Sequence, residues 1–346
     1  MIHQVNRKRP NFEQCSFSCL SILFFFLGSA AAQENYHTLM ADGEVQTVNA
    51  NGERFVDYII PEQPGFNQLI LEAVGADGGW IEYQYQDHFK ALRSKRVSGG
   101  EGAIVTATYS VGHGGNLPSG SMLRFVIGTR GHWAKYDLLT SGGYGAGGGG
   151  GTAVLLSKDR GATWTLLMVA GGGGGAGVRF REDRDEIELN AGLPGISGEH
   201  GAGGQHHKQV MADGGMQGSG GQSYQSTGGG GGAFKDGEHL AGVLIHGNAG
   251  WKDFRLNEQP LGGLGGIPQE GYRGGWGFGG GGSGLEGGGG GGGYSGGGAG
   301  MQGYGGGGGG SYVNQTSIFP TNVEKVENGN TNNTGDGFIR YKCINN

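Results

Sequence analysis

Three histidines form the group of side chains that most resembles a metal site. His200, His206 and His207 lie within the segment Glu199–Gly215. Metal sites combine such residues with further His, Cys or carboxylate ligands at characteristic spacings, and no such spacing accompanies these three. Adjacent side chains such as those of His206 and His207 also usually point apart. We therefore predict no metal site and no cofactor.

A formal nucleophile motif lies in the longest glycine tract. The pentapeptide GYSGG (Gly293–Gly297) fits G-x-S-x-G, which in hydrolases places a serine on a sharp turn. Inside a glycine tract such matches arise by chance, as do the repeated copies of G-x-G-x-x-G. A nucleotide-binding fold needs that second pattern between a strand and a helix, and no helix is expected after any copy. The sequence also has no Gly-Lys pair, so a P-loop is excluded. We predict that the protein is not an enzyme.

The most specific local motif is SKDRGATW, which fits the Asp-box pattern S-x-D-x-G-x-T-W. In sialidases and many other β-proteins this pattern forms a hairpin turn away from the active site. An Asp in such a turn accepts hydrogen bonds from nearby backbone, and the Gly permits an unusual backbone conformation. A structural turn is therefore predicted, and a glycosidase stays a remote alternative because the motif occurs once. The residues concerned are Ser157, Asp159, Gly161, Thr163 and Trp164.

The high glycine content raises the question of whether the chain is collagen-like, disordered or folded. The chain of 346 residues contains 85 Gly but only 8 Pro. Collagen requires Gly at every third position and abundant Pro, so it is excluded. Disordered chains are poor in apolar and aromatic residues, whereas this chain is 35% hydrophobic and 10% aromatic. The composition is compatible with a folded core.

The N-terminal residues resemble a secretory signal. A basic stretch (Arg7–Arg9) precedes an apolar run (Cys19–Leu27) and a small-residue cleavage site (Ala30–Ala32). We predict a signal peptide over 1–32 and a secreted chain that starts at Gln33. An uncleaved anchor is the alternative, but the run is well short of the ~20 residues that span a bilayer. No later run is long enough, so the cleaved chain is not expected to span a membrane.

Charge and cysteine content limit which classes of partner the protein can bind. The formal net charge is −6, and removal of the predicted signal, with its three bases and one acid, makes it more negative. Nucleic-acid binding needs clustered bases, so no nucleic-acid partner is expected. Cys15 and Cys19 lie in the predicted signal. Cys343 then remains alone, and both a buried thiol and an intermolecular disulfide stay open.

Hydrophobic patterns predict one domain over 33–346, strand-rich over 44–170 and polyglycine-rich over 142–312, with a closing strand at 337–343. Short runs rich in β-branched and aromatic residues, and alternation in AIVTATYSV, favour antiparallel sheets over a core. Further on, glycine tracts alternate with strands. Charged inserts between them are expected to be surface loops. The predicted strands include Arg54–Ile60, Leu69–Gly75, Ala103–Val111, Met122–Gly128, Thr152–Ser157, Thr165–Ala170 and Gly337–Cys343.

Oligoglycine is costly to order, because each fixed residue costs roughly 1–2 kcal/mol and buries no side chain. Several runs side by side can offset this cost. In the polyproline II conformation the backbone has three residues per turn and no internal hydrogen bonds. Without side chains, neighbouring rods approach closely and bond through their amides. Proline could not donate these bonds, which fits its scarcity. We predict a bundle of polyglycine II helices.

The glycine tracts and strands follow one another in an order that resembles a known family. The segments LEAVGADGG, SGGEGAIVTATYSV, LLMVAGGGGGAG and GGWGFGGGGSGLEGGGGGGGYSGGGAG are similar to the glycine-rich extracellular domain of the anaplastic lymphoma kinase and leukocyte tyrosine kinase receptors and secreted relatives, over roughly Tyr58 to Tyr341. The resemblance implies a tumour-necrosis-factor-like antiparallel β-sandwich of jelly-roll type with an inserted bundle of polyglycine II helices. In the receptors this region belongs to the ligand-binding ectodomain. This sequence contains no kinase, Cys-rich module or later membrane span.

Together these observations predict a secreted, non-catalytic recognition or adhesion protein whose partner is a protein or glycan on a cell surface, or matrix. A rigid bundle would display loops such as Gly79–Val97 and Val178–Asn190. A structural matrix or cell-wall protein is the main alternative. Two N-glycosylation sequons begin at Asn314 and Asn332. The candidate binding residues are the acids Glu182, Asp183, Asp185, Glu186 and Glu188 and the bases Lys90, Arg93, Lys95 and Arg96.

Overall fold

The described chain is all-β. The computed structural model describes residues 36–345 except 54, 138–141, 182–185, 207–208, 241–243, 252–259, 269–270, 328 and 331–334. The chain divides into two units, Met1–Asn35 and Tyr36–Asn346, and every described strand belongs to the second. The predicted signal peptide, residues 1–32, lies outside the described residues. Strands, bridges and turns account for the secondary structure of the described part, with no helix in it, and the predicted all-β class is confirmed.

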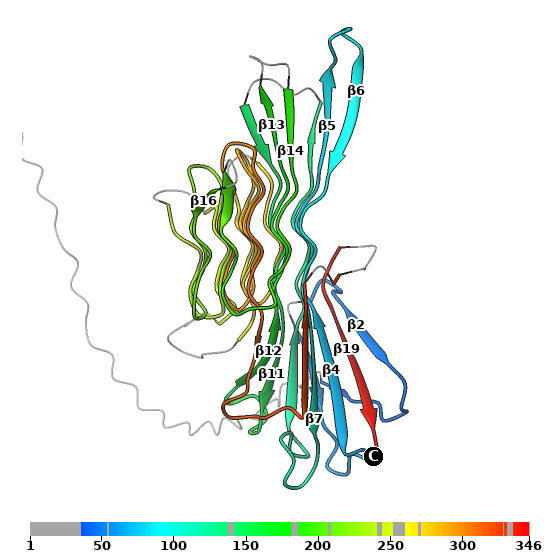
Figure 1. The fold of residues 1–346 in the computed structure, drawn as a ribbon. Coiled ribbons are helices and arrows are strands. Elements are labelled where there is room, and N and C mark those ends of the chain that lie inside the picture. Colours follow the sequence, from blue (N-terminus) through cyan, green and yellow to red (C-terminus); the bar gives the residue numbers. More distant parts are fainter. Residues whose placement is uncertain are drawn as a thin grey trace, which may run out of the picture. The chain divides into compact units, whose positions relative to one another are not determined.

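Two large open sheets share one hydrophobic core, and together they are called the sandwich below (Figure 1). The six-stranded sheet has the order β1 (His37–Thr38), β3 (Val56–Ile59), β8 (Met122–Val126), β11 (Thr152–Ser157), β12 (Thr165–Ala170) and β17 (Tyr312–Val313). The five-stranded sheet has the order β18 (Asn322–Val326), β7 (Ile104–Ser110), β4 (Gln68–Val74), β19 (Phe338–Ile344) and β2 (Gln46–Asn49).

Burial along the strands explains their sequence patterns. In β7 every second residue is buried, as the alternation predicts, because only one face of its sheet meets the core. In β11 all residues are buried, and in β12 all but the first. Their second face is covered by a separate hydrophobic cluster in which Phe278 and Ala233, from the glycine-rich part of the chain, pack on Leu155 and Val169. These strands are therefore apolar throughout.

Two smaller three-stranded sheets, the distal sheets, lie at the other end of the bundle of glycine-rich segments (Figure 1). They share a third core that includes Ile81, Tyr83, Val97 and Val178. The charged inserts are thus strands and not the expected surface loops, because alternate residues such as Ile81 and Tyr83 face this core. One distal sheet has the order β6 (Leu92–Val97), β5 (Ile81–Gln86) and β9 (Ala134–Tyr136). The other has the order β10 (Gly142–Gly145), β13 (Gly177–Arg181) and β14 (Glu186–Asn190). A separate hairpin pairs β15 (Gly204–His206) with β16 (Gln209–Ala212).

Glycine-rich segments join the sandwich to the distal sheets, so the chain runs back and forth between the two ends (Figure 1). Successive amides of a segment donate to different neighbours, and the pattern repeats after three residues. Gly172 and Gly175 each donate to the segment 287–293 at 2.8 Å, whereas Gly173 donates to the segment 75–80 at 2.8 Å. The connecting segments are 75–80 (β4 to β5), 98–103 (β6 to β7), 127–133 (β8 to β9), 146–151 (β10 to β11) and 171–176 (β12 to β13).

The segment 287–293 is bonded to neighbours on every side. It donates backbone hydrogen bonds to the segments 146–151, 228–232 and 303–310, and it accepts them from 171–176, 279–284 and 295–300. Its glycines are buried. A Cβ added at Gly290 would meet the carbonyl group of Gly297 well inside van der Waals contact. Only glycine fits at this position, so the tract is an ordered part of the fold and not a linker.

Candidate functional site

The β5–β6 hairpin ends in an exposed apolar tip. Phe89 is 77% exposed and Leu92 59% exposed. The turn is fixed by Asp87, whose carboxylate accepts from the backbone N–H groups of Phe89 at 3.0 Å and Ala91 at 2.9 Å. The same carboxylate accepts from Nε of Arg93 at 3.0 Å. The tip therefore presents two large apolar side chains on a turn with a defined shape.

The four basic residues predicted to bind a partner do not form one patch. Lys90 lies in the turn with a φ of 60°. Arg93 and Lys95 pair across the strands with Tyr85 and Tyr83, on the face that also carries core residues. Arg96 pairs with Glu82 and lies on the opposite face. Lys95 Nζ also lies 5.4 Å from the centre of the Tyr85 ring.

The acidic hairpin β13–β14 adjoins the same distal core, since Val178, Phe180 and Ile187 pack in it. Glu186 is exposed. Glu188 is occupied within the protein, because its carboxylate accepts from the Tyr304 hydroxyl at 2.9 Å and lies 3.7 Å from Arg181. The other predicted acids, Glu182, Asp183 and Asp185, lie outside the described residues.

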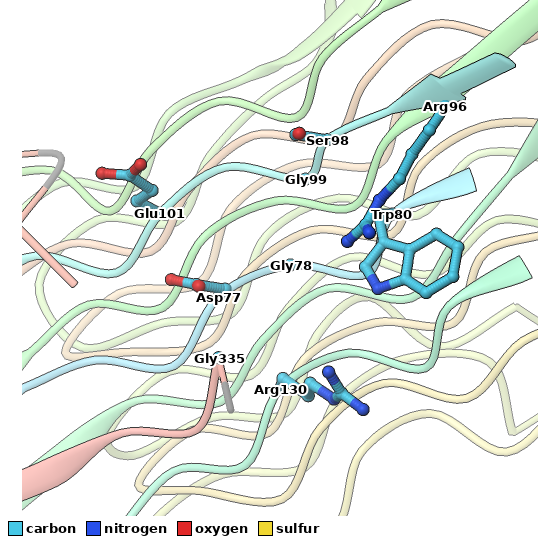
Figure 2. A pocket seen from close by; sticks show the side chains of 9 residues that line it. All are labelled: Asp77, Gly78, Trp80, Arg96, Ser98, Gly99, Glu101, Arg130 and Gly335. Carbon is cyan, nitrogen blue, oxygen red and sulfur yellow. The ribbon is translucent and has the colours of Figure 1, made fainter. Parts of the chain in front are cut away.

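A pocket of about 180 Å³ opens at the foot of the β5–β6 hairpin, where glycine-rich segments meet the distal sheets (Figure 2). Its walls carry Asp77, Trp80, Arg96, Glu101 and Arg130. The two guanidinium groups lie toward Trp80 in Figure 2, and the two carboxyl groups lie on the other side. The pocket thus carries basic groups on one side and carboxyl groups on the other.

Aromatic stacking holds one wall of the pocket. The Arg96 guanidinium carbon lies 3.7 Å from the centre of the Trp80 ring. Trp133 also stacks on this ring, with 4.8 Å between ring centres and an interplanar angle of 7°. A guanidinium over an indole gains a cation–π attraction. The contact fixes the Arg96 side chain, and neither Arg96 nor Arg130 forms an ion pair within the described part of the chain.

Asp77 forms the opposite wall. Burial raises its pKa to about 7, and the charges of Glu101 and Asp336 add to the increase. The increase is opposed by hydrogen bonds, including one that the backbone N–H of Gly102 donates to Oδ1 at 3.0 Å. Near neutral pH the carboxyl group is therefore divided between its neutral and charged forms, and a nearby cation would favour the charged form.

The Asp-box segment forms the turn between β11 and β12. Asp159 accepts from the backbone N–H of Thr163 at 2.8 Å and from its hydroxyl at 2.6 Å, and the Ser157 hydroxyl donates to it at 2.8 Å. Gly161 has a φ of 90°. Trp164 is buried and covers the outer face of the six-stranded sheet. These residues stabilise the hairpin and do not line the pocket at the foot of the β5–β6 hairpin.

The sequon at Asn314 is built into the fold. Its side-chain nitrogen is buried and donates to the Leu166 carbonyl and to the Ser317 hydroxyl, each at 3.0 Å. N-glycosylation would attach the glycan to this same nitrogen. Because the nitrogen is buried and hydrogen-bonded in the fold, we expect no glycan at Asn314. Asn332 lies outside the described residues.

Cys343 is a free, buried thiol whose pKa burial raises to about 12. Of the alternatives for this residue, the structure shows the buried thiol. His206 contacts Gln302 and Tyr304, with 3.3 Å between His206 Nε2 and Gln302 Oε1. His200 is exposed, and His207 lies outside the described residues. In the part of the chain that the structure describes, no three His, Cys, Asp or Glu side chains gather as metal ligands would.

Sequence reasoning missed the apolar tip and the pocket. The tip residues Phe89 and Leu92 stand in a segment rich in charged residues, which predicted a solvated loop. A lone Phe in such a hydrophilic turn could have indicated an exposed contact residue. The pocket residue Asp77 stands in the run GADGGW, where a charged residue among small ones is conspicuous. Its convergence with Arg130 depends on the fold.

A scan of protein-family models and a search of curated proteins give no match to this chain. The resemblance to the glycine-rich receptor domain therefore remains a prediction. Among the described residues no helix is long and apolar enough to cross a membrane.

Proposed function

We propose that the chain is a secreted, non-catalytic recognition or adhesion protein that contacts a protein or glycan on a cell surface, or matrix. The observation that carries the proposal is the tip of the β5–β6 hairpin. Phe89 and Leu92 are 77% and 59% exposed there. Contiguous exposed apolar surface marks interaction sites, and aromatic residues are enriched at the centres of interfaces.

The interactions that hold the β5–β6 hairpin in place also favour a recognition function. Hydrogen bonds to the Asp87 carboxylate fix the turn, and Ile81, Tyr83 and Val97 anchor the strands in the distal core. Glycine-rich segments continue from both strands and are bonded to several neighbours. A surface that is already ordered loses little entropy when it binds, so a rigid support would increase affinity.

The proposal includes a finer description of the fold. The six neighbours of the segment 287–293 and the three-residue repeat of the hydrogen bonds support hexagonally packed polyglycine II helices. The two sheets around one core are consistent with a tumour-necrosis-factor-like jelly roll, as in the glycine-rich domain of the anaplastic lymphoma kinase and leukocyte tyrosine kinase receptors.

The test compares two serine substitutions at the tip with a matched control elsewhere. Fluorescently labelled protein is applied to cells and matrix of the organism that encodes it, and bound label is measured by flow cytometry and microscopy. The double variant Phe89→Ser/Leu92→Ser should lose at least about tenfold in binding, as expected for central interface residues. Phe319→Ser changes a phenylalanine that is 60% exposed on the sandwich and should bind as the parent does.

Equal binding by the parent and the double variant would overturn the role of the tip. Assembly of the protein into fibres or sheets without any cell binding would instead favour a structural matrix protein. Removal of surface proteins with a protease, and of glycans with glycosidases, then separates the two partner classes.

A further inference from the structure

The pocket at the foot of the β5–β6 hairpin is separate from the tip that carries the proposed function. The tip lies at the far end of strands β5 and β6, whereas the pocket is lined by residues at and beyond the opposite ends of these strands (Figures 1 and 2). Its volume of about 180 Å³ is several times the ~30 Å³ that one water occupies in the liquid. The space therefore suits a small organic molecule.

The pair of arginines defines one end of a ligand. Arg96 stacks on Trp80 at 3.7 Å. Arg130 is exposed, and its backbone N–H donates to Asp336 Oδ1 at 2.9 Å. Their guanidinium groups form no ion pair within the described residues. Planar guanidinium groups are well matched to carboxylates through paired hydrogen bonds. This side of the pocket is thus suited to a carboxylate.

The opposite side of the pocket is suited to a cation. Asp77 is flanked by Glu101, whose charge helps to raise the Asp77 pKa to about 7, after the larger effect of burial. A carboxyl group in such a position gains more from a bound cation than an exposed one does, because the cation removes both the repulsion and part of the cost of burial. An ammonium group also supplies donors for several carboxylate oxygens.

Gly335 keeps the space between the two sides open. Its φ is 72°, a conformation that suits glycine. A Cβ at this position would lie 3.4 Å from Asp77 Oδ2 and 3.3 Å from Arg130 Cδ. A side chain here would therefore enter the region in which the carboxyl group and the arginine approach each other.

The balance of charges selects among ligand classes. A simple anion would be repelled by Asp77 and Glu101, and a simple cation by Arg96 and Arg130. A neutral sugar would offer a charged partner to neither the arginines nor the carboxyl groups. We propose that this pocket binds a free α-amino acid in its zwitterionic form, with the carboxylate at Arg96 and Arg130 and the ammonium group at Asp77 and Glu101.

The test begins with the intact protein and each of the common L-amino acids. Differential scanning fluorimetry identifies those that raise the melting temperature, and isothermal titration calorimetry then measures their Kd. We expect at least one amino acid to bind with a Kd of about 1 mM or tighter, the range of a small ligand with few contacts. Its N-acetyl derivative, which lacks the ammonium group, and its methyl ester, which lacks the carboxylate, should each bind at least about tenfold more weakly, as loss of an ion pair predicts.

Three variants locate the site. Arg130→Gln and Asp77→Asn should each weaken binding at least about tenfold. Arg340→Gln, which removes an arginine of the five-stranded sheet that pairs with Glu72, should leave the Kd unchanged. The proposal is wrong if no amino acid binds, if the acetylated and esterified forms bind equally well, or if the pocket variants bind as tightly as Arg340→Gln. Circular dichroism of each variant establishes that it is folded before binding is measured.

Discussion

Asp57 and Arg124 face each other across strands β3 and β8 and form a bidentate ion pair. Nε and Nη2 of Arg124 donate to Oδ1 and Oδ2 of Asp57, each at 2.8 Å. The side chains are only 7% and 14% exposed, for Arg124 and Asp57 respectively. The guanidinium carbon also lies 3.7 Å from the Phe55 ring centre and 4.2 Å from that of Trp164. The pair thus connects the sheet to the Asp-box turn.

Removal of Asp57 should be strongly destabilising. Asp57→Ala leaves the buried Arg124 charge without its carboxylate, which typically costs about 3–5 kcal/mol of unfolding free energy. Urea denaturation measures the change. Glu72→Ala provides the matched control, since it breaks the more exposed pair with Arg340 at 3.1 Å and should cost at most about 1 kcal/mol. Similar losses in the two variants would contradict a special role for the buried pair.

One methyl group should disrupt the glycine bundle. In Gly290→Ala the Cβ would meet the backbone of Gly297, which cannot move away as a flexible side chain can. We expect a loss of about 3 kcal/mol or more in unfolding free energy, the upper end for overpacking. At Gly198 a Cβ would lie 3.7 Å from the Ile196 side chain, an ordinary contact. Gly198→Ala should therefore change stability by no more than about 0.5 kcal/mol.

Amide hydrogen exchange gives a second readout for the bundle. The amides of the segment 287–293 donate to neighbouring segments or to the Thr227 hydroxyl, so they should exchange slowly in the parent protein. Fast exchange throughout this segment in the folded parent would show that the glycine-rich segments are loosely held, and rigid support of the hairpins would then lack a basis.

The Asp-box turn should weaken in acid. Hydrogen bonds from the Thr163 side chain and backbone and from Ser157 lower the pKa of Asp159 to about 2. A lowered carboxyl pKa stabilises the fold above the unfolded pKa of ~3.9, and this contribution is lost as the pH falls through the folded value. The parent should therefore melt higher than Asp159→Asn at pH 5, and the gap should narrow between about pH 4 and pH 2. Thermal melts across this range check the prediction, and a constant gap would contradict it.

Asp77 should have the opposite effect on stability. Its pKa is raised to about 7, first by burial and further by Glu101 and Asp336, so the folded state holds a proton that the unfolded state releases near pH 4. Stability should fall as the pH rises between about 4 and 7, by an amount of the order of 2–4 kcal/mol. In Asp77→Asn this slope should disappear, and the variant should be more stable than the parent at pH 8. Urea denaturation at several pH values measures both, and parallel curves would contradict the prediction.

Composition and local pattern were sufficient for part of the fold. The alternation in Ala103–Val111 predicted one buried face, which β7 has. The uninterrupted apolar runs of β11 and β12 indicated strands, but nothing local indicated that Phe278 and Ala233 would cover their second face. The tight order of the glycine tract followed from the cost of fixing glycine, since only mutual hydrogen bonds among several runs can compensate for it.

The distal sheets show where such reasoning is insufficient. The segment IEYQYQ alternates as a strand does, yet its charged surroundings favoured a surface loop. The partners of Ile81 and Tyr83 include Ala134 and Val178, which lie far away in the sequence, so no local window contains this core. The pocket has the same origin, because Asp77 and Arg130 come from two different connecting segments and Arg96 comes from β6.

The position of β19 has a consequence for biogenesis. This strand lies between β4 and β2 in its sheet, with Phe338 opposite both Val74 and Asn49, which come far earlier in the sequence. While the chain emerges from the ribosome, β4 and β2 therefore remain unjoined until β19 has been made. Pairings of such long sequence separation form slowly and leave strand edges unprotected meanwhile. The nascent protein should need protection from aggregation until β19 is made, and a variant that lacks β19 should fail to complete this sheet.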